Sequence, residues 1–431
     1  MRGVLRLTPA SVAANRRASR AGLTLVEVLM SMLVTGIGVL SVIVLLPLSF
    51  VRAVQATNLT NGTILRYNAE SALDVNPRLL LRWQPNQVYA VGDTIVPKNL
   101  VPPVALKVTT AGTSGLVEPG WAPAGTTNDG AGTLVWTAQL AGAYTSPILP
   151  LGSQYPPCFV IDPLGWNALG APLQTNFGNN GAGGIDANAA LRFNGELATP
   201  GLAVQQVTLP DSWVEQARGP VTAFTPTSAT LSGPDLAGVG YSTPAAPAAA
   251  YPIPVMSRTV LIDSTGKVSQ TRIITGTTPA TGIVSWTDPL TGTFSPVSAR
   301  VETQDTRYTW ILTVRPSSAG GTSNVTVTVF FNRPLVADDE QVYQASGSDG
   351  VLTPFTVTYP AGKKPFVKKG GFLFDCYFGR WYRITNIAND TGSQMQVYVD
   401  SPRPQTDVIT NLNFGVVCMR GVVDQFPIPP K

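Results

Sequence analysis

The 431-residue sequence contains no histidine. This absence excludes histidine-based catalytic triads, histidine metal ligands and acid–base chemistry by imidazole. Charged residues are also scarce: they make up 13% of the chain, whereas hydrophobic residues make up 44%. Such a composition is more typical of an exported protein than of a cytosolic enzyme.

Cysteine is nearly absent as well, with Cys158, Cys376 and Cys418 the three in the chain. They lie too far apart in the sequence for a zinc-binding motif. Two interpretations remain open. Outside the cytoplasm, Cys376 and Cys418 could form a disulfide and leave Cys158 free; otherwise all three are buried thiols.

Positive charge is concentrated at the N-terminus. Residues 1–22 contain five arginines and no acidic residue, so the rest of the chain has 29 − 5 = 24 basic and 25 acidic residues, a net charge of −1. The remainder shows no basic stripe that would contact phosphates, so we expect no nucleic-acid partner. Its one basic cluster is KKPFVKK (363–369), which is either a solvated loop or a contact for a polyanion or lipid headgroup.

Residues 23–51 form an apolar run with a single charge, at Glu27. The run is longer than the roughly 20 residues that cross a bilayer. The arginine-rich leader predicts that residues 1–22 face the cytoplasm and the C-terminus lies outside, in a single-pass protein of the cytoplasmic (inner) membrane. An alternative is twin-arginine export at Arg16-Arg17, which is disfavoured because apolar residues do not closely follow the pair.

A secretory signal peptide has a shorter apolar core and a small residue after it. Here the small residue, Gly22, comes before the run. The stretch from Gly22 to Glu27, GLTLVE, resembles the class III signal of type IV pilins and type II secretion pseudopilins. The resemblance covers residues 16 to about 75. It departs from the family at Leu23, where Phe or Met is usual, and at Pro47, which lies later than the family's helix-kinking proline.

This resemblance implies a prepilin-type cleavage and methylation. A membrane aspartyl peptidase, prepilin peptidase, would cut between Gly22 and Leu23 and methylate the new amine of Leu23. Glu27 would be the fifth residue of the mature chain and would act in assembly. A lone carboxylate among lipid tails is unfavourable, by roughly 2.5–3.5 kcal/mol at a helix centre. In a stack of subunits Glu27 could meet the amine of Leu23 on a neighbour; the alternative is a carboxylate that snorkels to the membrane surface.

Apolar residues continue at helical spacing beyond the membrane run, and Pro77 should end the helix. The sequence therefore predicts one long helix over residues 23–76. We expect a kink at Pro47 and a weak point or break at Asn61-Gly62.

Residues 82–140 predict a small β module with strands at 87–89, 94–96, 104–109 and 134–137. It resembles modules of phage tail and cell-surface proteins and, more loosely, small chitin-binding modules. Its aromatic residues are either the core of a small domain, which is favoured, or a platform on which a sugar stacks. These candidate ligand-binding residues are Trp83, Tyr89, Trp121 and Trp136. Asp93 and Asp129 are expected to be turn residues.

Residues 141–431 predict a β-rich, pilin-like head with loops rich in Pro, Ala and Gly. Two hairpins stand out, one formed by 308–316 and 324–334 and one by 368–387 and 393–402. The predicted fold is α+β, with the long N-terminal transmembrane helix packed on a mainly antiparallel β head. Paired catalytic carboxylates, G-x-S-x-G and P-loop motifs are absent from the sequence, so we expect no enzyme activity, no cofactor and no metal.

The expected function is that of a minor pilin- or pseudopilin-like structural subunit in a type IV pilus or a protein-secretion pseudopilus. Its expected partners are prepilin peptidase, other pilin or pseudopilin subunits and the cytoplasmic membrane. After processing it would enter a filament in the periplasm or at the cell surface. The alternative is a membrane-anchored surface protein whose 82–140 module holds a glycan.

Overall fold

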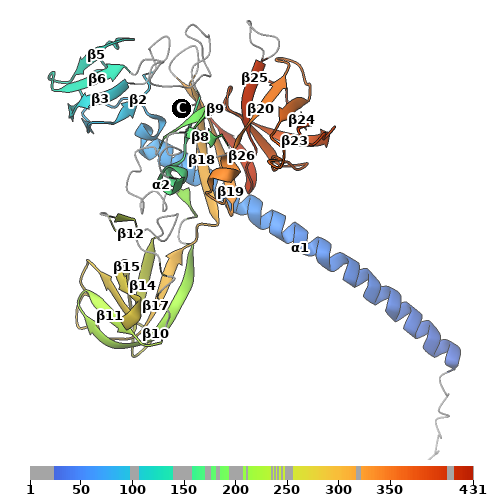
Figure 1. Cartoon of the computed structure of the whole chain (residues 1–431). Coiled ribbons are helices and arrows are strands. Elements are labelled where there is room, and N and C mark those ends of the chain that lie inside the picture. Colours follow the sequence, from blue (N-terminus) through green and yellow to red (C-terminus); the bar gives the residue numbers. More distant parts are fainter. Residues whose placement is uncertain are drawn as a thin grey trace, which may run out of the picture. The chain divides into compact units, whose positions relative to one another are not determined.

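The structure is a computed structural model whose ribbon appears in Figure 1. It describes residues 24–97, 106–138, 158–169, 176–180, 185–193, 207–209, 212–233, 236, 239, 242–243, 246–247, 256–316, 322–404 and 412–430. The chain divides into two units, Met1–Thr57 and Asn58–Lys431.

The first element is a single helix, α1 (Leu25–Val75), close to the predicted 23–76. Its 51 residues correspond to about 77 Å. It ends before Pro77, as expected. The Asn76 side chain then accepts a hydrogen bond from the Arg78 N–H (3.2 Å) and caps the 3₁₀ helix η1 (Pro77–Leu80). The predicted break at Asn61-Gly62 is wrong, since both residues lie inside α1. The helix continues there because Gly62 is buried beside the Phe426 ring and Leu65, Ala69 and Leu73 pack in the core.

A six-stranded sheet forms the centre of the second unit, in the order β26-β19-β18-β7-β9-β8. Neighbouring strands are antiparallel except β7 and β9, which are parallel. The predicted hairpin of 308–316 and 324–334 is confirmed as β18 and β19. The strand bounds are β7 Phe159–Ile161, β8 Asn176–Asn179, β9 Ile185–Phe193, β18 Tyr308–Pro316, β19 Ser323–Phe331 and β26 Val422–Ile428.

Both faces of this sheet are buried. On one face Trp310, Leu312 and Val327 share a core with the outer end of α1, through Leu65, Ala69 and Leu73. On the other face Ile311 and Phe330 pack with Phe374 and Trp381 of a later β-barrel. Burial on both faces explains why β18 and β19 read as nearly continuous runs of apolar and β-branched residues. The second unit is therefore an α+β structure with mostly antiparallel strands.

Two closed six-stranded barrels are inserted in the connections of the sheet. The first separates β9 from β18, and the second separates β19 from β26. The first contains β10 (Trp213–Thr225), β11 (Ser228–Leu231), β14 (Ser257–Asp263), β15 (Ser269–Thr278), β16 (Ile283–Trp286) and β17 (Pro296–Gln304). The second contains β20 (Val342–Gly347), β21 (Phe355–Thr358), β22 (Phe372–Asp375), β23 (Arg380–Ala388), β24 (Gln394–Val399) and β25 (Leu412–Val417).

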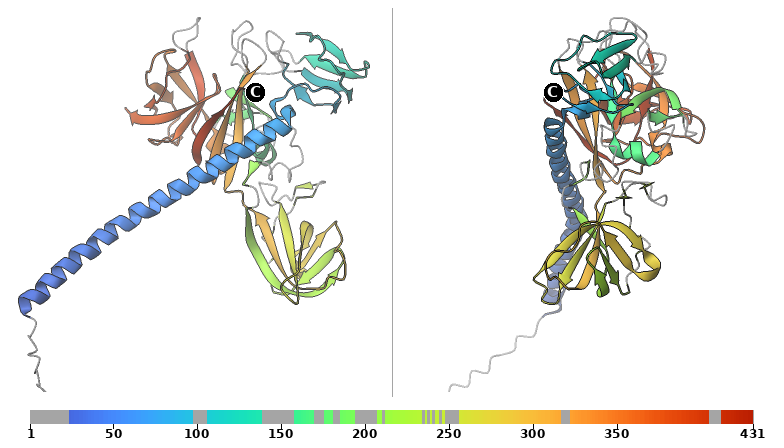
Figure 2. Two further views of the ribbon diagram at one scale, coloured as in Figure 1. Left: turned by 180° about the vertical axis from the view of Figure 1, so that it is seen from behind. Right: turned by 90° about the vertical axis from the view of Figure 1, so that its left-hand side faces the viewer.

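The two barrels have the same topology. When the six strands of each barrel are numbered in chain order, both follow the order 1-2-5-4-3-6. Each has its own buried core. The predicted hairpin of 368–387 and 393–402 is confirmed in part: β23 and β24 pair as expected in the second barrel, but 368–387 also contains β22, which pairs with β23. The region 141–431 is thus divided more finely than the single β head that we expected, into a sheet and two barrels (Figure 2).

The predicted β module lies between α1 and β7. It contains a four-stranded sheet, β2-β3-β6-β5, and a two-stranded ribbon, β1-β4. Two of these strands, β4 and β5, were not predicted, because their sequences GT and TTND lack the apolar residues that indicate a strand. The strand bounds are β1 Val88–Tyr89, β2 Thr94–Ile95, β3 Leu106–Thr110, β4 Gly112–Thr113, β5 Thr126–Asp129 and β6 Leu134–Ala138.

Several short elements complete the described chain. They are the helices α2 (Pro163–Leu169), η3 (Pro279–Thr281) and η4 (Ala337–Glu340) and the ribbon of β12 (Ser242–Thr243) and β13 (Ala246–Pro247). Cys158, Cys376 and Cys418 are all free and buried. The bridge between Cys376 and Cys418, one of the two interpretations of the sequence, is therefore wrong. Cys376 lies in the core between the sheet and the second barrel, whereas Cys418 lies in the core of that barrel.

We expect Gly62→Ala to stabilise the outer part of α1. A Cβ atom at Gly62 would lie 3.4 Å from the Phe426 ring, an ordinary contact distance. Alanine loses less backbone entropy than glycine in a helix, which is worth about 0.5–1 kcal/mol. Hydrogen exchange of residues 58–75 in the detergent-solubilised chain should slow by several-fold. Faster exchange in the variant would show that the helix is weak at this point after all.

Candidate functional site

The first unit presents an apolar helix surface. Every described side chain from Thr24 to Thr57 is exposed, including Leu29, Met32, Leu40 and Phe50. Among the described residues, α1 is the one helix long and apolar enough to cross a membrane. A surface of this size is unfavourable in water, so it indicates an apolar environment such as lipid or other helices.

Five hydroxyl groups in this part of α1 donate hydrogen bonds to its own backbone, among them Thr57 to the Ala53 carbonyl (3.0 Å). Ser31 donates to the Val28 carbonyl (2.8 Å), Thr35 to the Ser31 carbonyl (2.7 Å), Ser41 to Gly38 (2.7 Å) and Ser49 to Leu45 (3.0 Å). An apolar solvent offers no partners to a hydroxyl proton. These bonds therefore make the segment compatible with such a solvent despite its serines and threonines.

Glu27 lies in the first turn of α1. Its backbone N–H donates to the carbonyl (3.0 Å) and the Oγ1 (3.3 Å) of Thr24. A threonine followed three residues later by a glutamate is the capping-box pattern, and an acidic side chain in the first turn is favoured by the helix dipole. Glu27 thus has a local role that our sequence interpretation missed, although Thr24 signalled it. Gly22 and Leu23, the predicted cleavage site, lie outside the described residues.

The four aromatic candidates of the β module gather in its core. Tyr89 and Trp136 are completely buried and meet edge to face, with ring centroids 4.8 Å apart. Trp83 and Trp121 are partly buried against them. The ring faces of Tyr89 and Trp136 are therefore covered by protein and offer no surface on which a sugar could stack.

Asp129 organises this core. Its carboxylate accepts hydrogen bonds from the indole N–H groups of Trp83 (2.6 Å) and Trp136 (3.2 Å). It also accepts from the backbone N–H groups of Gly115 (2.9 Å) and Gly130 (2.6 Å). Four donors satisfy this buried carboxylate, so it ties two loops and two tryptophans together. Asp93 is a turn residue, whose Oδ2 accepts from the Ala90 N–H (2.8 Å).

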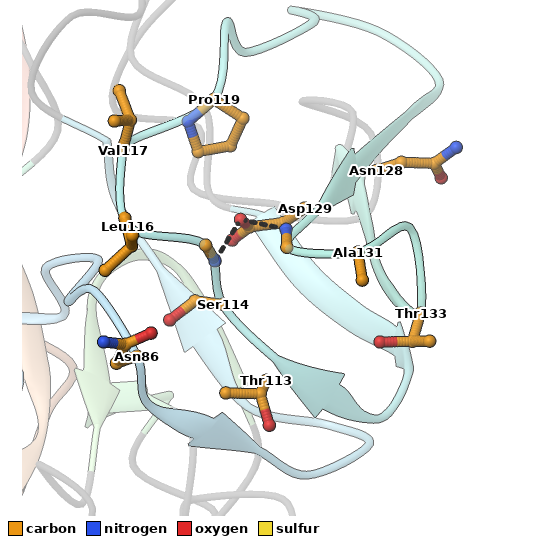
Figure 3. A pocket seen from close by; sticks show the side chains of 12 residues that line it. Asn86, Thr113, Ser114, Leu116, Val117, Pro119, Asn128, Asp129, Ala131 and Thr133 are labelled. Atoms are coloured by element: carbon orange, nitrogen blue, oxygen red, sulfur yellow. Dashed lines mark hydrogen bonds between the residues drawn. The ribbon is translucent and has the colours of Figure 1, made fainter.

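A shallow hollow of about 660 Å³ lies beside Asp129 (Figure 3). Leu116 and Val117 on its rim are 75% and 80% exposed. Its polar lining includes Thr113, Asn128 and Thr133, whereas the four aromatic candidates take no part in it. A ligand in this hollow would meet aliphatic, amide and hydroxyl groups and no aromatic ring.

Buried charges form a second cluster, where strands β7, β9 and β19 of the six-stranded sheet end. Arg333 donates to both oxygens of Asp162 (2.8 and 2.6 Å) and to Oε1 of Glu340 (2.7 Å). Arg192 pairs with the same two carboxylates, with its Nε 3.3 Å from Asp162. All four side chains are at most 3% exposed. They link β7, β9, the end of β19 and η4, and so act as a clamp.

The clamp changes the pKa of Asp162. Burial alone would raise the pKa of Asp162, but the charges and hydrogen bonds of Arg333 and Arg192 outweigh it and lower that pKa. Asp375 is the contrasting case in the second barrel. Burial raises the pKa of Asp375 even though Arg403 donates to it (2.9 Å).

Within the part of the chain that the structure describes, groups of three or more side chains suited to a metal are absent.

The lysine cluster at 363–369 lies on an exposed loop of the second barrel. Lys364 pairs with Asp390 (2.5 Å) and Lys363 lies 4.0 Å from Asp338. These acidic neighbours reduce the positive charge of the loop, as expected of a solvated segment.

Comparison with known proteins finds no match, whether to a protein-family model, a curated protein or a solved structure.

We expect Asp129→Ala to unfold the β module locally. The variant leaves four N–H donors without their acceptor, including that of the fully buried Trp136, which should cost about 3 kcal/mol or more. Hydrogen exchange of residues 106–138 in the intact chain would report the opening. Asp93→Ala is the matched control, because that side chain is 30% exposed and should cost about 1 kcal/mol. Equal effects of the two variants would contradict the central role of Asp129.

We expect Arg333→Met to destabilise the second unit by about 3–5 kcal/mol at neutral pH, because it leaves buried carboxylates underpaired. A lowered folded-state pKa means that Asp162 contributes stability above its unfolded pKa of about 3.9, and that this contribution is lost as the pH falls through the folded value. The difference in thermal unfolding between parent and variant should therefore shrink below about pH 4. A difference that grows in acid would refute the assignment.

Proposed function

We propose that the chain is a minor pilin- or pseudopilin-like structural subunit. The observation that carries the proposal is the division of α1 into two parts. Its inner part, up to Thr57, exposes an apolar surface with an acidic residue near its start, whereas its outer part packs on an antiparallel sheet through Leu65, Ala69 and Leu73. One helix thus combines a membrane or filament segment with a β-rich head, as the resemblance at residues 22–27 implies.

In this proposal the precursor sits in the cytoplasmic membrane with its arginine-rich leader inside. Prepilin peptidase removes residues 1–22, and the helix then moves from lipid into contact with other subunits. Both environments are apolar, so the exposed side chains of Leu25–Thr57 stay out of water throughout the transfer. Glu27 gains a partner only in the second environment, where the amine of Leu23 on a neighbour can meet it.

A structural role also fits the ionisable groups of the second unit. Asp129, Asp162 and Asp375 are buried, and each accepts several hydrogen bonds from neighbouring groups. A catalytic carboxylate must instead reach a substrate. These three carboxylates instead hold strands and loops of the second unit together.

A second candidate is a membrane-anchored protein that binds a glycan through the β module. The observation that favours it is the hollow beside Leu116 and Val117. The binding face would then be these loops and not the four aromatic residues. Glycan-array binding by the intact chain, lost on Val117→Asp and kept on Trp121→Phe, would support this candidate.

We expect mass spectrometry of the mature protein to find an N-terminal peptide that begins at Leu23 and is one methyl group heavier than its sequence. Glu27→Ala should still be cleaved but should no longer co-sediment with filaments, since the carboxylate acts after processing. Ser49→Ala is a control that changes the same helix without removing a charge. An intact leader, or a cut after residue 51, would refute the proposal.

A further inference from the structure

Two arginines without acidic partners lie where the six-stranded sheet meets the second barrel. Arg315 is the last residue but one of β18, and Arg380 is the first residue of β23. They are 380 − 315 = 65 residues apart in the sequence, so no local pattern joins them. Among the described residues, neither side chain makes a hydrogen bond or an ion pair. We call this pair the arginine corner.

The fold brings the two arginines to the same place. Side chains alternate along a strand, so Arg315 is on the same face of β18 as Thr313. That face receives the second barrel, because Thr313 accepts a hydrogen bond from the Trp381 indole N–H (3.0 Å). A Cβ atom at Gly379 would lie 3.3 Å from Cγ of Arg315, so the arginine stem passes close to this glycine. Arg380 follows Gly379 directly in the chain.

Arg315 is partly withdrawn from water and has no negative charge to compensate for this. Its Nε atom is buried and lacks a hydrogen-bond partner. Burial and the charge of Arg380 both lower the pKa of Arg315. The neighbouring thiol of Cys158 stays neutral, because burial raises its pKa to about 12. Asp375 of the same barrel is already paired with Arg403 (2.9 Å).

The deeply buried arginines of the second unit are compensated differently. Three of them, with side chains at most 2% exposed, each pair with two carboxylates: Arg192, Arg333 and Arg403. A charge that leaves water is normally paired in this way. Arg315 departs from the rule, since the charge beside it has the same sign. The segments that adjoin Cys158 and Arg315 in the sequence, 139–157 and 317–321, contain no Asp or Glu that could supply the missing charge.

We propose that the arginine corner binds a phosphate group through Arg315 and Arg380. A guanidinium group presents its N–H donors in a planar fork that fits two oxygens of one oxyanion. A phosphate group carries a charge of about −1.5 to −2 at neutral pH and so offsets both arginines, whereas a carboxylate would offset one. Arg380 is exposed, so an anion can reach the corner from solution. The site lies within the second unit and does not depend on the proposed function.

The turn between β22 and β23 holds the arginine corner in shape before any ligand arrives. Gly379 has a φ of +58°, and a Cβ atom there would overlap the side chain of Cys158, so the position requires glycine. The backbone N–H groups of Tyr377 and Phe378 donate to Asp375 (2.8 and 3.3 Å) and fix the same turn. The repulsion between the two arginines is therefore built into the fold, and a bound anion relieves it without first having to order the loop.

Titration calorimetry of the full-length chain in detergent with inorganic phosphate tests the site. We expect saturable binding that weakens about tenfold or more in Arg380→Gln and in Arg315→Gln, since each variant removes a charged fork. Arg383→Gln is the matched control and should bind as the parent does. Arg383 is exposed on the same strand, but its odd spacing from Arg380 places it on the other face.

Thermal unfolding gives a second readout with the opposite sign. In phosphate-free buffer of low ionic strength, Arg380→Gln should unfold at a higher temperature than the parent, because it removes the repulsion on Arg315. Added phosphate should raise the unfolding temperature of the parent above that in chloride of equal ionic strength, and should not do so in the variant. Arg380 is exposed, so this variant carries the test even if Arg315→Gln does not fold.

Several results would overturn the proposal. They are a parent chain that does not bind phosphate, an equal loss of binding in Arg383→Gln, and an Arg380→Gln variant that binds as tightly as the parent. Acetate binding as tight as that of phosphate would overturn the choice of a doubly charged ligand. Glycerol 1-phosphate distinguishes the source of the phosphate group. Tighter binding than inorganic phosphate would assign the corner to a phosphate ester, and weaker binding would assign it to the free ion.

Discussion

The packing of Leu65, Ala69 and Leu73 on the six-stranded sheet is the contact on which the second unit depends. These three side chains are 0–3% exposed and share one core with Trp310, Leu312 and Val327. Because the helix covers one face of β18 and β19, the other face is free to receive the second barrel. The sheet is thus the middle layer, and its strands β18 and β19 have buried side chains on both faces. Removal of either neighbour would expose large apolar side chains to water, such as Trp310 on one face and Phe330 on the other.

The sheet also explains how so large a second unit is assembled. Its six strands come from positions between 159 and 428, and the chain leaves it for each barrel and then returns. Insertions are tolerated at such connections when they fold around a core of their own. Both barrels meet this condition, because each encloses its own cluster and closure leaves no unpaired edge strand. The same strand order, 1-2-5-4-3-6, therefore occurs in both barrels of this chain.

Local patterns in the sequence predicted the long helix and several strands, but they missed others, such as β4, β5 and β10, and gave no sign of barrel closure. The long helix and the hairpin of β18 and β19 followed from periodicity and turn residues over short distances. Closure of the first barrel depends on pairing between Trp213 and Gln304, residues too far apart for any local signal. The break predicted at Asn61-Gly62 was wrong for a similar reason, since contact with Phe426 comes from the other end of the chain. The aromatic residues of the β module could be assigned to a core only once Asp129 was seen to accept from two of them.

Glu27 joins the local chemistry of the helix to the proposed assembly. With cleavage after Gly22, the new amine would lie just before the start of α1, where the positive end of the helix dipole disfavours a cation. A carboxylate one turn into the helix offsets both the amine and the dipole, while Thr24 caps the first turn. If the chain is processed as proposed, Glu27 would therefore stabilise the new end of each helix. Its carboxylate remains exposed in the isolated chain, so a cation from a neighbouring helix can still reach it. In the proposed function the same carboxylate would thus act twice, first beside the new amine of its own helix and then as the acceptor for a neighbouring subunit.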